Sequence, residues 1–552
     1  MKTLNKPRQK INQIYFYFLL ILFTDFIMAK AQTVSEDLLK FNGSLNLSSD
    51  LYSVNGIQAR QPGNVQRLLL RTNLRLFNQI DIPFEVSLSN SDSRFLQPFN
   101  QFGVSPRITD WLRFHGGYFY TNLSELSFGD IKIYGGGLEL TPGNFRLKAF
   151  YGRSKVAREP DSLKGFGGIY NQTTYGFLIG YGNENVAYLN LSFFKSIDDS
   201  ASIKRISISE GPIENLVSSA SFGFKIFKPL FIRAELAASL FSSDIQSQTI
   251  STVKIPKTIF TPKVSTQVDG AAKLGIEIEP QSFWALRFGA KWIGPGFYSA
   301  GYSNLQNDLL ELTIDPTLRL LENKLNLRSS IGIRKNNLRN NKLSTTNRFI
   351  GLFAADYQVT DFFGINLQYN NNQIKATQYS DSLKISNVFN LISISPRFNF
   401  SAFNGINNLS LTYSYQNSED SNPLFRSKVS NKTNTINLIH SVFFPSTLSF
   451  TTSILHNHVT LPNLNVKITS INEIISHQFF KNKLSVSLNL GYSITQVTNT
   501  NGFYIFGIRA GYSLDKFGNI SFNLTNNNFK SGDPLSPSFN EFIGNLQYSI
   551  NF

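Results

Sequence analysis

The sequence predicts an all-β protein, a single transmembrane, antiparallel, up-and-down β-barrel of about 26 strands, within a range of about 22 to 26. Three observations predict this class. Apolar and polar residues alternate with a period of two along most of the chain, short turn-forming links alternate with longer polar links, and the amino end has the pattern of an export segment. Residues 32–552 are expected to form this one domain.

The amino end, residues 1–31, is a predicted secretory signal peptide that is cleaved before Gln32. A basic stretch precedes the apolar residues 14–23, and Ala29-Lys30-Ala31 supplies the small-residue cleavage motif. The apolar stretch is too short to cross a membrane as a helix, and no later run of apolar residues is long enough either. The basic residues are Lys2, Lys6, Arg8 and Lys10.

The strands are recognised by one apolar and one polar face. Residues 67–76 place mostly leucines on one face and arginines on the other, and residues 286–292 and 484–492 repeat the alternation of apolar and polar faces. The alternation of short and long links between the strands goes out of phase between residues 90 and 111, which indicates that one strand is missing there. A strand made of residues 102–108, turning at Thr109-Asp110-Trp111, restores the phase and brings the total to about 26.

The links alternate between short and long. Thr141-Pro142-Gly143-Asn144 is a short turn, whereas the links near residues 155–171, 242–263, 294–308 and 494–502 are longer. This asymmetry is typical of short periplasmic turns and longer extracellular loops. A sheet in lipid must close, since an unpaired backbone group costs several kcal/mol there. About 26 strands enclose roughly 50 Å, so we expect loops, the 90–110 segment or another chain to fill part of the lumen, although no constricting loop stands out.

The last strand alternates strictly as Phe542-x-Gly544-x-Leu546-x-Tyr548-x-Ile550-x-Phe552. It resembles the C-terminal strand of Gram-negative outer-membrane β-barrel proteins. The resemblance implies an outer-membrane location and recognition by the outer-membrane assembly machinery. The chain as a whole looks like a large porin-like barrel with neither a plug nor a periplasmic domain. The residues expected to close the barrel and carry the assembly signal are Leu546, Tyr548, Ile550 and Phe552.

Composition narrows the partners. Removing residues 1–31 takes five of the 52 Lys+Arg and one of the 36 Asp+Glu, which leaves 47 minus 35, a formal charge of +12. No nucleic-acid motif accompanies this charge, so the expected anionic partners are outer-membrane lipid, above all lipopolysaccharide, or a solute in the lumen. Without cysteine, the chain has no disulfide, no lipid-modified cysteine and no thiolate site.

Basic side chains outnumber acidic ones on the polar faces of the predicted strands. In a lumen with low-dielectric walls such an excess concentrates anions. The alternative is that these side chains pair with carboxylates or simply solvate the wall. The residues predicted to line the lumen are Arg71, Arg75, Arg113, Arg146, Lys148, Arg233, Arg287, Lys291, Arg328, Arg334 and Arg509.

Other candidate sites are weaker. Trp111, Trp284 and Trp292 lie at predicted strand ends, where interfacial aromatic girdles occur. His456 and His458 share one face of a strand but have no third ligand, so no metal site is predicted. No catalytic or cofactor-binding motif is found.

Three functions remain open. The first is an outer-membrane channel or transport protein for polar solutes, with anionic ones favoured by the basic excess. The second is a non-enzymatic subunit or scaffold of an outer-membrane assembly or secretion complex, with a lumen blocked by loops or by a protein partner. The third is a barrel enzyme that acts on lipids, which the absence of a recognisable motif disfavours.

Overall fold

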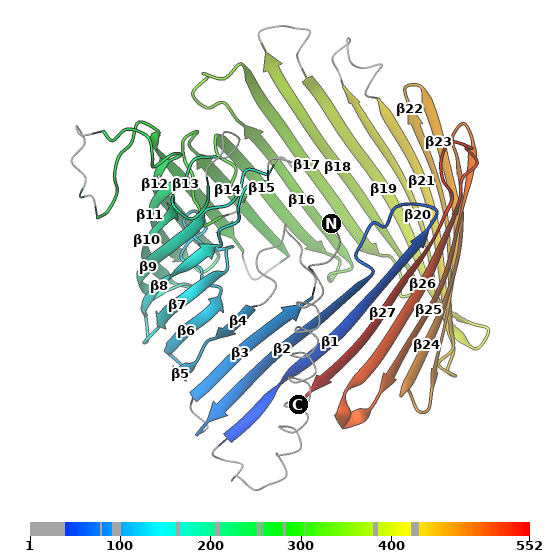
Figure 1. Ribbon diagram of the computed structural model, residues 1–552. Coiled ribbons are helices and arrows are strands. Elements are labelled where there is room, and N and C mark those ends of the chain that lie inside the picture. Colours follow the sequence, from blue (N-terminus) through cyan, green and yellow to red (C-terminus); the bar gives the residue numbers. More distant parts are fainter. Residues whose placement is uncertain are drawn as a thin grey trace.

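The computed structural model is one closed antiparallel β-barrel (Figure 1). It describes residues 39–77, 80–90, 101–161, 166–204, 210–250, 256, 258–279, 283–302, 304–378, 385–420 and 430–552. The predicted signal peptide, residues 1–31, lies outside the described residues. Among those described, no helix is long and apolar enough to cross a membrane.

Every wall element is a strand that pairs with its neighbours in the chain. The strands are β1 (Leu39–Asn55), β2 (Asn64–Leu76), β3 (Ile80–Ser89), β4 (Gln101–Val104), β5 (Arg107–Thr109), β6 (Leu112–Phe119), β7 (Ile133–Leu140), β8 (Phe145–Lys155), β9 (Asn171–Asn183), β10 (Ala187–Asp199), β11 (Glu214–Phe227), β12 (Leu230–Ser242), β13 (Thr266–Ile278), β14 (Trp284–Ile293), β15 (Leu309–Leu320), β16 (Leu325–Lys335), β17 (Ser344–Gln358), β18 (Phe363–Gln378), β19 (Ile385–Ala402), β20 (Gly405–Asp420), β21 (Asn431–Phe443), β22 (Ser449–Leu461), β23 (Leu464–Phe479), β24 (Leu484–Gln496), β25 (Thr500–Ser513), β26 (Asn519–Lys530) and β27 (Phe539–Asn551). A single 3₁₀ turn, η4 (Asp515–Phe517), joins β25 to β26 among the described residues.

The 27 segments make 26 wall positions, because β4 and β5 share one position between β3 and β6. The ladder is interrupted at Ser105 and Pro106, where proline has no N–H to give. Two backbone hydrogen bonds still connect this interruption to the neighbouring strands. The N–H of Ser105 donates to Pro83 O at 2.8 Å, and the N–H of Phe114 donates to Pro106 O at 2.8 Å. The predicted strand count is therefore confirmed, including its least regular member.

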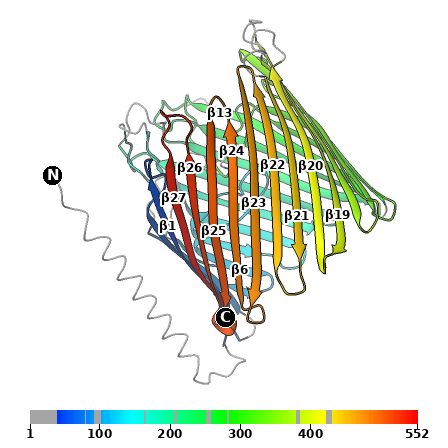
Figure 2. The ribbon, with the colours of Figure 1, turned by 90° about the vertical axis from the view of Figure 1, so that its right-hand side faces the viewer.

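The barrel closes where β1 meets β27, which lie side by side in Figures 1 and 2. The register runs from Ser44 opposite Asn551 to Asn55 opposite Asn540. Beyond it, Gly43 and Phe552 exchange two backbone hydrogen bonds of 2.8 and 3.0 Å. The ladder therefore uses the whole of the last strand and leaves no free edge at this seam.

The two faces of the wall differ as the period of two requires. On β9, Phe177, Ile179 and Tyr181 are exposed, whereas the alternate residues Thr174 and Leu178 are buried. The exposed apolar side chains lie on the convex face, which is therefore the outer one. The alternate side chains lie on the concave face, and segments from inside the barrel cover some of them.

Links at one end are short and links at the other end are mostly long. Two differ from expectation: the link expected near 494–502 shortens to 497–499 because β24 and β25 extend further, and β22 joins β23 at the long-link end through residues 462–463 alone. The strands β17 to β20, of 15 to 18 residues, form the highest part of the wall in Figure 2.

Candidate functional site in the lumen

Two links at the long-link end fold into the barrel. The β6–β7 loop consists of residues 120–132, and the β14–β15 loop consists of residues 294–308. The first turns at Ser124–Phe128, where the N–H of Leu123 donates to Phe128 O at 2.9 Å. At its tip, Leu126 and Phe128 have no exposed surface, whereas Glu125, which precedes Leu126, is exposed. The sequence predicted a long link at 294–308 and offered loops as one possible filling of the lumen, but it did not identify the two loops that turn inward.

The two loops contact each other directly. Phe128 and Gly301 form a parallel β-bridge, and the hydroxyl of Ser299 donates to the carbonyl of Ser127. The hydroxyl of Tyr302 donates to Ser124 O at 2.7 Å. Burial raises the pKa of Tyr302, so this hydroxyl remains a donor at neutral pH.

The β6–β7 loop is fixed to the wall by a buried hydroxyl cluster. Ser124 Oγ lies 2.9 Å from Ser219 Oγ on β11, and Ser127 Oγ lies 3.1 Å from Ser192 Oγ on β10. The backbone N–H of Leu126 donates to the carboxylate of Glu235 on β12 at 3.1 Å. Further out, Lys273 on β13 pairs with Glu125. Because one short loop contacts side chains of four successive strands, those side chains must lie on the concave face of the wall.

Asn215 on β11 fixes the β14–β15 loop. Its amide Nδ2 donates to Tyr298 O at 3.0 Å, and its Oδ1 accepts from the N–H of Ala300 at 2.8 Å. Ser239 also donates to Tyr298 O at 2.6 Å. The ring of Tyr298 stacks on Phe241 with a centroid distance of 4.1 Å. Asn215 has no exposed surface, so these hydrogen bonds are shielded from water.

An apolar belt on the inner wall receives both loops. Phe128 packs between Phe150 and Phe194, with ring centroids 4.8 and 5.1 Å away. Successive strands from β7 to β15 each place one buried apolar residue on the otherwise polar concave face. These residues are Ile133, Phe150, Leu178, Phe194, Val217, Ala237, Ala271, Ile293 and Leu309. This interruption of the polar faces is the signal in the sequence that could have revealed the inward loops.

A third link reinforces the β14–β15 loop. Asp308, at the end of that loop, accepts the N–H groups of Asn337 and Leu338 at 2.9 and 2.8 Å and pairs with Lys342 at 2.5 Å, all in the 336–343 link. Burial alone would raise the pKa of Asp308, but the Lys342 ammonium and the two N–H groups together hold it below its ordinary value. The carboxylate is therefore ionised at neutral pH and joins two links.

The ladder registers place the predicted basic residues on the concave face, and neighbouring groups engage most of them. Arg71 pairs with Glu85 at 3.0 Å and Arg233 with Glu277 at 2.7 Å. The remaining engaged residues are Arg75 with Asp81, Arg113 and Lys148 with Glu139, Arg146 with Gly182 O and Asn190, and Arg334 with Glu311. In the described part of the chain, the side chains of Arg287, Lys291, Arg328 and Arg509 have no hydrogen bond or ion pair.

Three of these unpaired cations lie close together on the wall. Arg287 and Lys291 are on β14 and Arg328 is on β16, next to the strands that hold the inward loops. Thr317 on β15 lies opposite both Ala285 and Arg328, which places Arg328 near Arg287 across the intervening strand. These three cations lie beside the narrowed region, whereas Arg509, the fourth unpaired one, lies on β25.

The other predicted residues lie on the convex face, at the seam or in turns. Tyr548 and Ile550 pack with Leu45 and Leu70 across the seam, and the ring of Phe552 stacks on Phe41 at 5.1 Å. Leu546 is half exposed on the same face. Trp284 and Trp292 lie at the two ends of β14, and Trp111 lies in the turn before β6.

The histidine pair is also on the convex face. His456 lies opposite Ile436 and His458 opposite Asn434, and the Nδ1 of His456 lies 2.9 Å from Thr469 Oγ1. Among the described residues, no group of three His, Cys, Asp or Glu side chains could hold a metal ion. Glu473, expected on the polar face, lies instead on the convex face and accepts a hydrogen bond from Thr452 at 2.5 Å.

Comparison with known proteins gives likeness in structure only. No family model matches the chain, and no curated protein sequence matches it. The P pilus usher translocation pore PapC is similar over 93% of this chain and 99% of its own, with 11% identity and a TM-score of 0.40. PapC in the Escherichia coli P pilus tip assembly intermediate covers 93% of this chain and 60% of its own, at 11% identity and a TM-score of 0.47. The Pseudomonas aeruginosa outer membrane protein OpdK is similar over 69% of this chain and 99% of its own, with 10% identity and a TM-score of 0.32.

Proposed function

We propose that this protein is an integral outer-membrane β-barrel, exported by a cleaved signal peptide, that passes polar solutes through a lumen narrowed by its own loops. The observation that carries the proposal is the pair of inward loops, 120–132 and 294–308, which are hydrogen-bonded to the concave wall. A barrel this wide needs such a filling to keep a membrane sealed against larger molecules. The open part of the lumen then lies beside the opposite wall.

The convex face supports the membrane location. Trp284 and Trp292 both point outward on β14, with Leu286, Phe288 and Ala290 between them on the same face. Eight residues span about 27 Å along a strand and about 21 Å in height at a tilt of about 40°, close to the apolar band of about 25 Å of outer-membrane barrels. The two tryptophans are therefore suited to the two interfaces.

The unpaired cations support a preference for anions. Arg287, Lys291 and Arg328 add positive potential next to the narrowed region, where low-dielectric walls strengthen it. Arg71, Arg75 and Arg233, by contrast, are paired with carboxylates. Selectivity should therefore depend on a few side chains and not on the total charge of the barrel.

Planar-bilayer conductance of the purified full-length protein tests the proposal. We expect stable conducting steps with an anion-favouring reversal potential in a salt gradient. Silent insertion together with a co-purifying protein would instead support a subunit with a filled lumen. A serine-reactive probe that labels the folded protein would support a lipid-acting enzyme.

The double variant Arg287→Glu and Arg328→Glu tests the charge argument. It should reverse the ion preference, because two unpaired cations become anions next to the narrowed region of the lumen. The matched control is Lys228→Glu with Lys481→Glu, which makes the same change of charge in turns at the short-link end. Equal selectivity in both variants would refute the assignment of Arg287 and Arg328 to the conducting path.

A further inference from the structure

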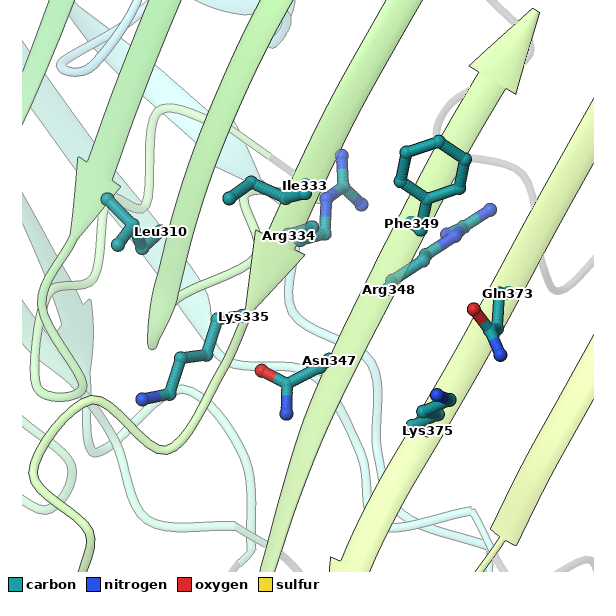
Figure 3. Close-up of a pocket in the computed structure, with 9 residues that line it drawn as sticks. All are labelled: Leu310, Ile333, Arg334, Lys335, Asn347, Arg348, Phe349, Gln373 and Lys375. Atoms are coloured by element: carbon teal, nitrogen blue, oxygen red, sulfur yellow. The ribbon is translucent and has the colours of Figure 1, made fainter.

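A pocket of about 260 Å³ opens on the convex wall near the long-link end. Its lining comes from four neighbouring strands, β15 to β18 (Figure 3). Ile333 and Phe349 are exposed apolar side chains at its base, and Leu310 lies beside them. The pocket is therefore apolar at its base and opens on the face that we assign to lipid.

The part of the pocket nearest the long-link end, which is drawn lowest in Figure 3, carries two lysines. Lys335 on β16 lies opposite Asn347 on β17, and Asn347 lies opposite Lys375 on β18. Figure 3 shows the Asn347 amide between the two lysines. The lysines are about 10 Å apart across two strand spacings, a gap that two long side chains can close around one anion. Among the described residues, neither ammonium has an ion pair or a hydrogen bond.

The two arginines next to the pocket are already engaged on the other side of the wall. Arg334 donates to Glu311 at 2.6 Å, and Arg348 donates to Asn372 at 2.8 Å, both on the concave face. The positive charge at the mouth of the pocket therefore comes from Lys335 and Lys375. Both lysines are exposed and neither has an anionic partner among the described residues, so an anion at the mouth of the pocket can bind them.

The height of the lysines fits a headgroup. Trp292 is in the same hydrogen-bonded row as Leu310 and Lys335. Rows tilt with the strands, so Lys335 lies about 6 Å above the level of Trp292 and Lys375 about 12 Å above it, for strands about 4.8 Å apart and tilted about 40°. Ile333 and Phe349, two residues lower along their strands, lie about 5 Å below the lysine row, which puts them about 1 and 4 Å above the level of Trp292, near the boundary between headgroups and acyl chains.

We propose that this pocket binds a phosphorylated lipid of the outer leaflet, with Lys335 and Lys375 on a phosphate and with Ile333, Phe349 and Leu310 against an acyl chain. The inference rests on the proposed membrane location, since only a lipid offers both chemistries at this height. Lysine binds phosphate as a point charge, and the Asn347 amide can donate a further hydrogen bond. A lipid can contact the two lysines with its phosphate and the apolar side chains with its acyl chain, whereas a free anion can contact only the lysines. The pocket should therefore bind a lipid in preference to a free anion.

The test uses the full-length protein in detergent and native mass spectrometry. The probes are a bisphosphorylated disaccharide lipid, the same lipid without phosphates, and inorganic phosphate as a competitor. We expect retention of the phosphorylated lipid, and about tenfold weaker binding in Lys335→Gln with Lys375→Gln, as two exposed charge contacts of ordinary strength produce together. The control Lys228→Gln with Lys481→Gln should bind as the wild type does.

Three outcomes would overturn the site: equal retention in both double variants, equal retention of the lipid without phosphates, or displacement by inorganic phosphate at concentrations comparable with those of the lipid. Vesicle flotation separates this failure from failure of the proposed function. A protein that inserts and conducts but shows no phosphate dependence refutes only the lipid site. A protein that does not insert refutes the membrane proposal itself.

Discussion

Gly301 is the residue at which the two inward loops meet. A Cβ atom at this position would lie 2.4 Å from Ser127 O and 2.7 Å from the Cα of Phe128, both of which belong to the β6–β7 loop. The backbone atoms at these distances cannot move aside without separating the loops. A side chain as small as alanine is therefore excluded at the contact.

Gly301→Ala should loosen the two loops and leave the wall intact. We expect larger and noisier conducting steps and cleavage of residues 120–132 by an added protease, because the loops can no longer pair. Gly275→Ala is the matched control, since a Cβ atom there meets nothing within 4 Å on the same concave wall. Identical single-channel records for the two variants would show that the loops do not limit conduction.

At the residue scale the sequence predicts faces well and partners poorly. The period of two places Arg71, Arg233 and Arg287 on the same polar face, and the ladders agree. Whether an arginine is paired depends on more than the register of the next strand, which sets Glu85 beside Arg71 and sets Glu277 and Asp315 opposite Arg287. Glu277 pairs instead with Arg233, and Asp315 accepts a hydrogen bond from Ser330, so Arg287 has no ion pair among the described residues. Register depends on turn geometry and on packing across the sheet, which one strand does not encode.

Among the elements, the interrupted strand shows what a pattern can predict. Residues 102–108 alternate poorly and contain Pro106, yet the wall needs a strand there to keep the long links at one end. The structure meets this need with two short segments, β4 and β5, in one position. Parity of the links, a property of the whole chain, thus predicts an element that its own residues hardly indicate.

The inward loops could not be predicted in the same way. The β6–β7 loop holds its place through contacts with β10, β11 and β12, which are far away in sequence. Its own residues, 120–132, are short polar and apolar groups without a repeating period. Long-range packing decides its course, so the only signal lies outside the loop, in the apolar residues that interrupt the polar faces of β7 to β15.

The tether between Asp308 and the 336–343 link should depend on pH. The pKa of Asp308 is lowered in the folded protein, so its stabilising effect is complete above the pKa of an unfolded aspartate, about 4, and is lost as pH falls through the lower folded value. Conductance noise should therefore rise below about pH 4. Asp308→Asn should show that noise already at neutral pH.

Asp533→Asn controls for the loss of an exposed loop carboxylate. Asp533 accepts hydrogen bonds from Leu535 and Ser536 within its own link, 531–538, and holds no second link. Its variant should keep the quiet behaviour of the wild type from neutral pH down to about pH 4, the range in which an aspartate is ionised. If Asp308→Asn behaves in the same way, the tether does not contribute to the rigidity of the lumen.

For the whole molecule, closure requires the last strand. Deleting residues 539–552 removes the partner of β1 and of β26 and leaves two unpaired edges in lipid, each lost bond costing several kcal/mol there. We expect no folded barrel in the outer-membrane fraction, as measured by heat-dependent mobility in gel electrophoresis. Normal insertion of the shortened chain would refute the closed barrel.

The control for that deletion shortens the link before the last strand and keeps the pairing of β27 with β26 and β1. Replacing residues 531–537 by Asn-Gly keeps Phe529 opposite Phe539 and forms a two-residue hairpin turn. This variant should assemble normally, because every strand keeps both partners. Its failure would attribute the effect of the deletion to the link and not to the strand.

The one-sided attachment of the loops has a mechanical consequence. Their described contacts fall on β3, on strands between β6 and β15 and on the 336–343 link, so this sector of the wall is two layers thick. A double layer resists bending far more than a single sheet does. In the proposed membrane setting, we therefore expect the single-layer sector from β19 to β26 to deform first under lateral pressure.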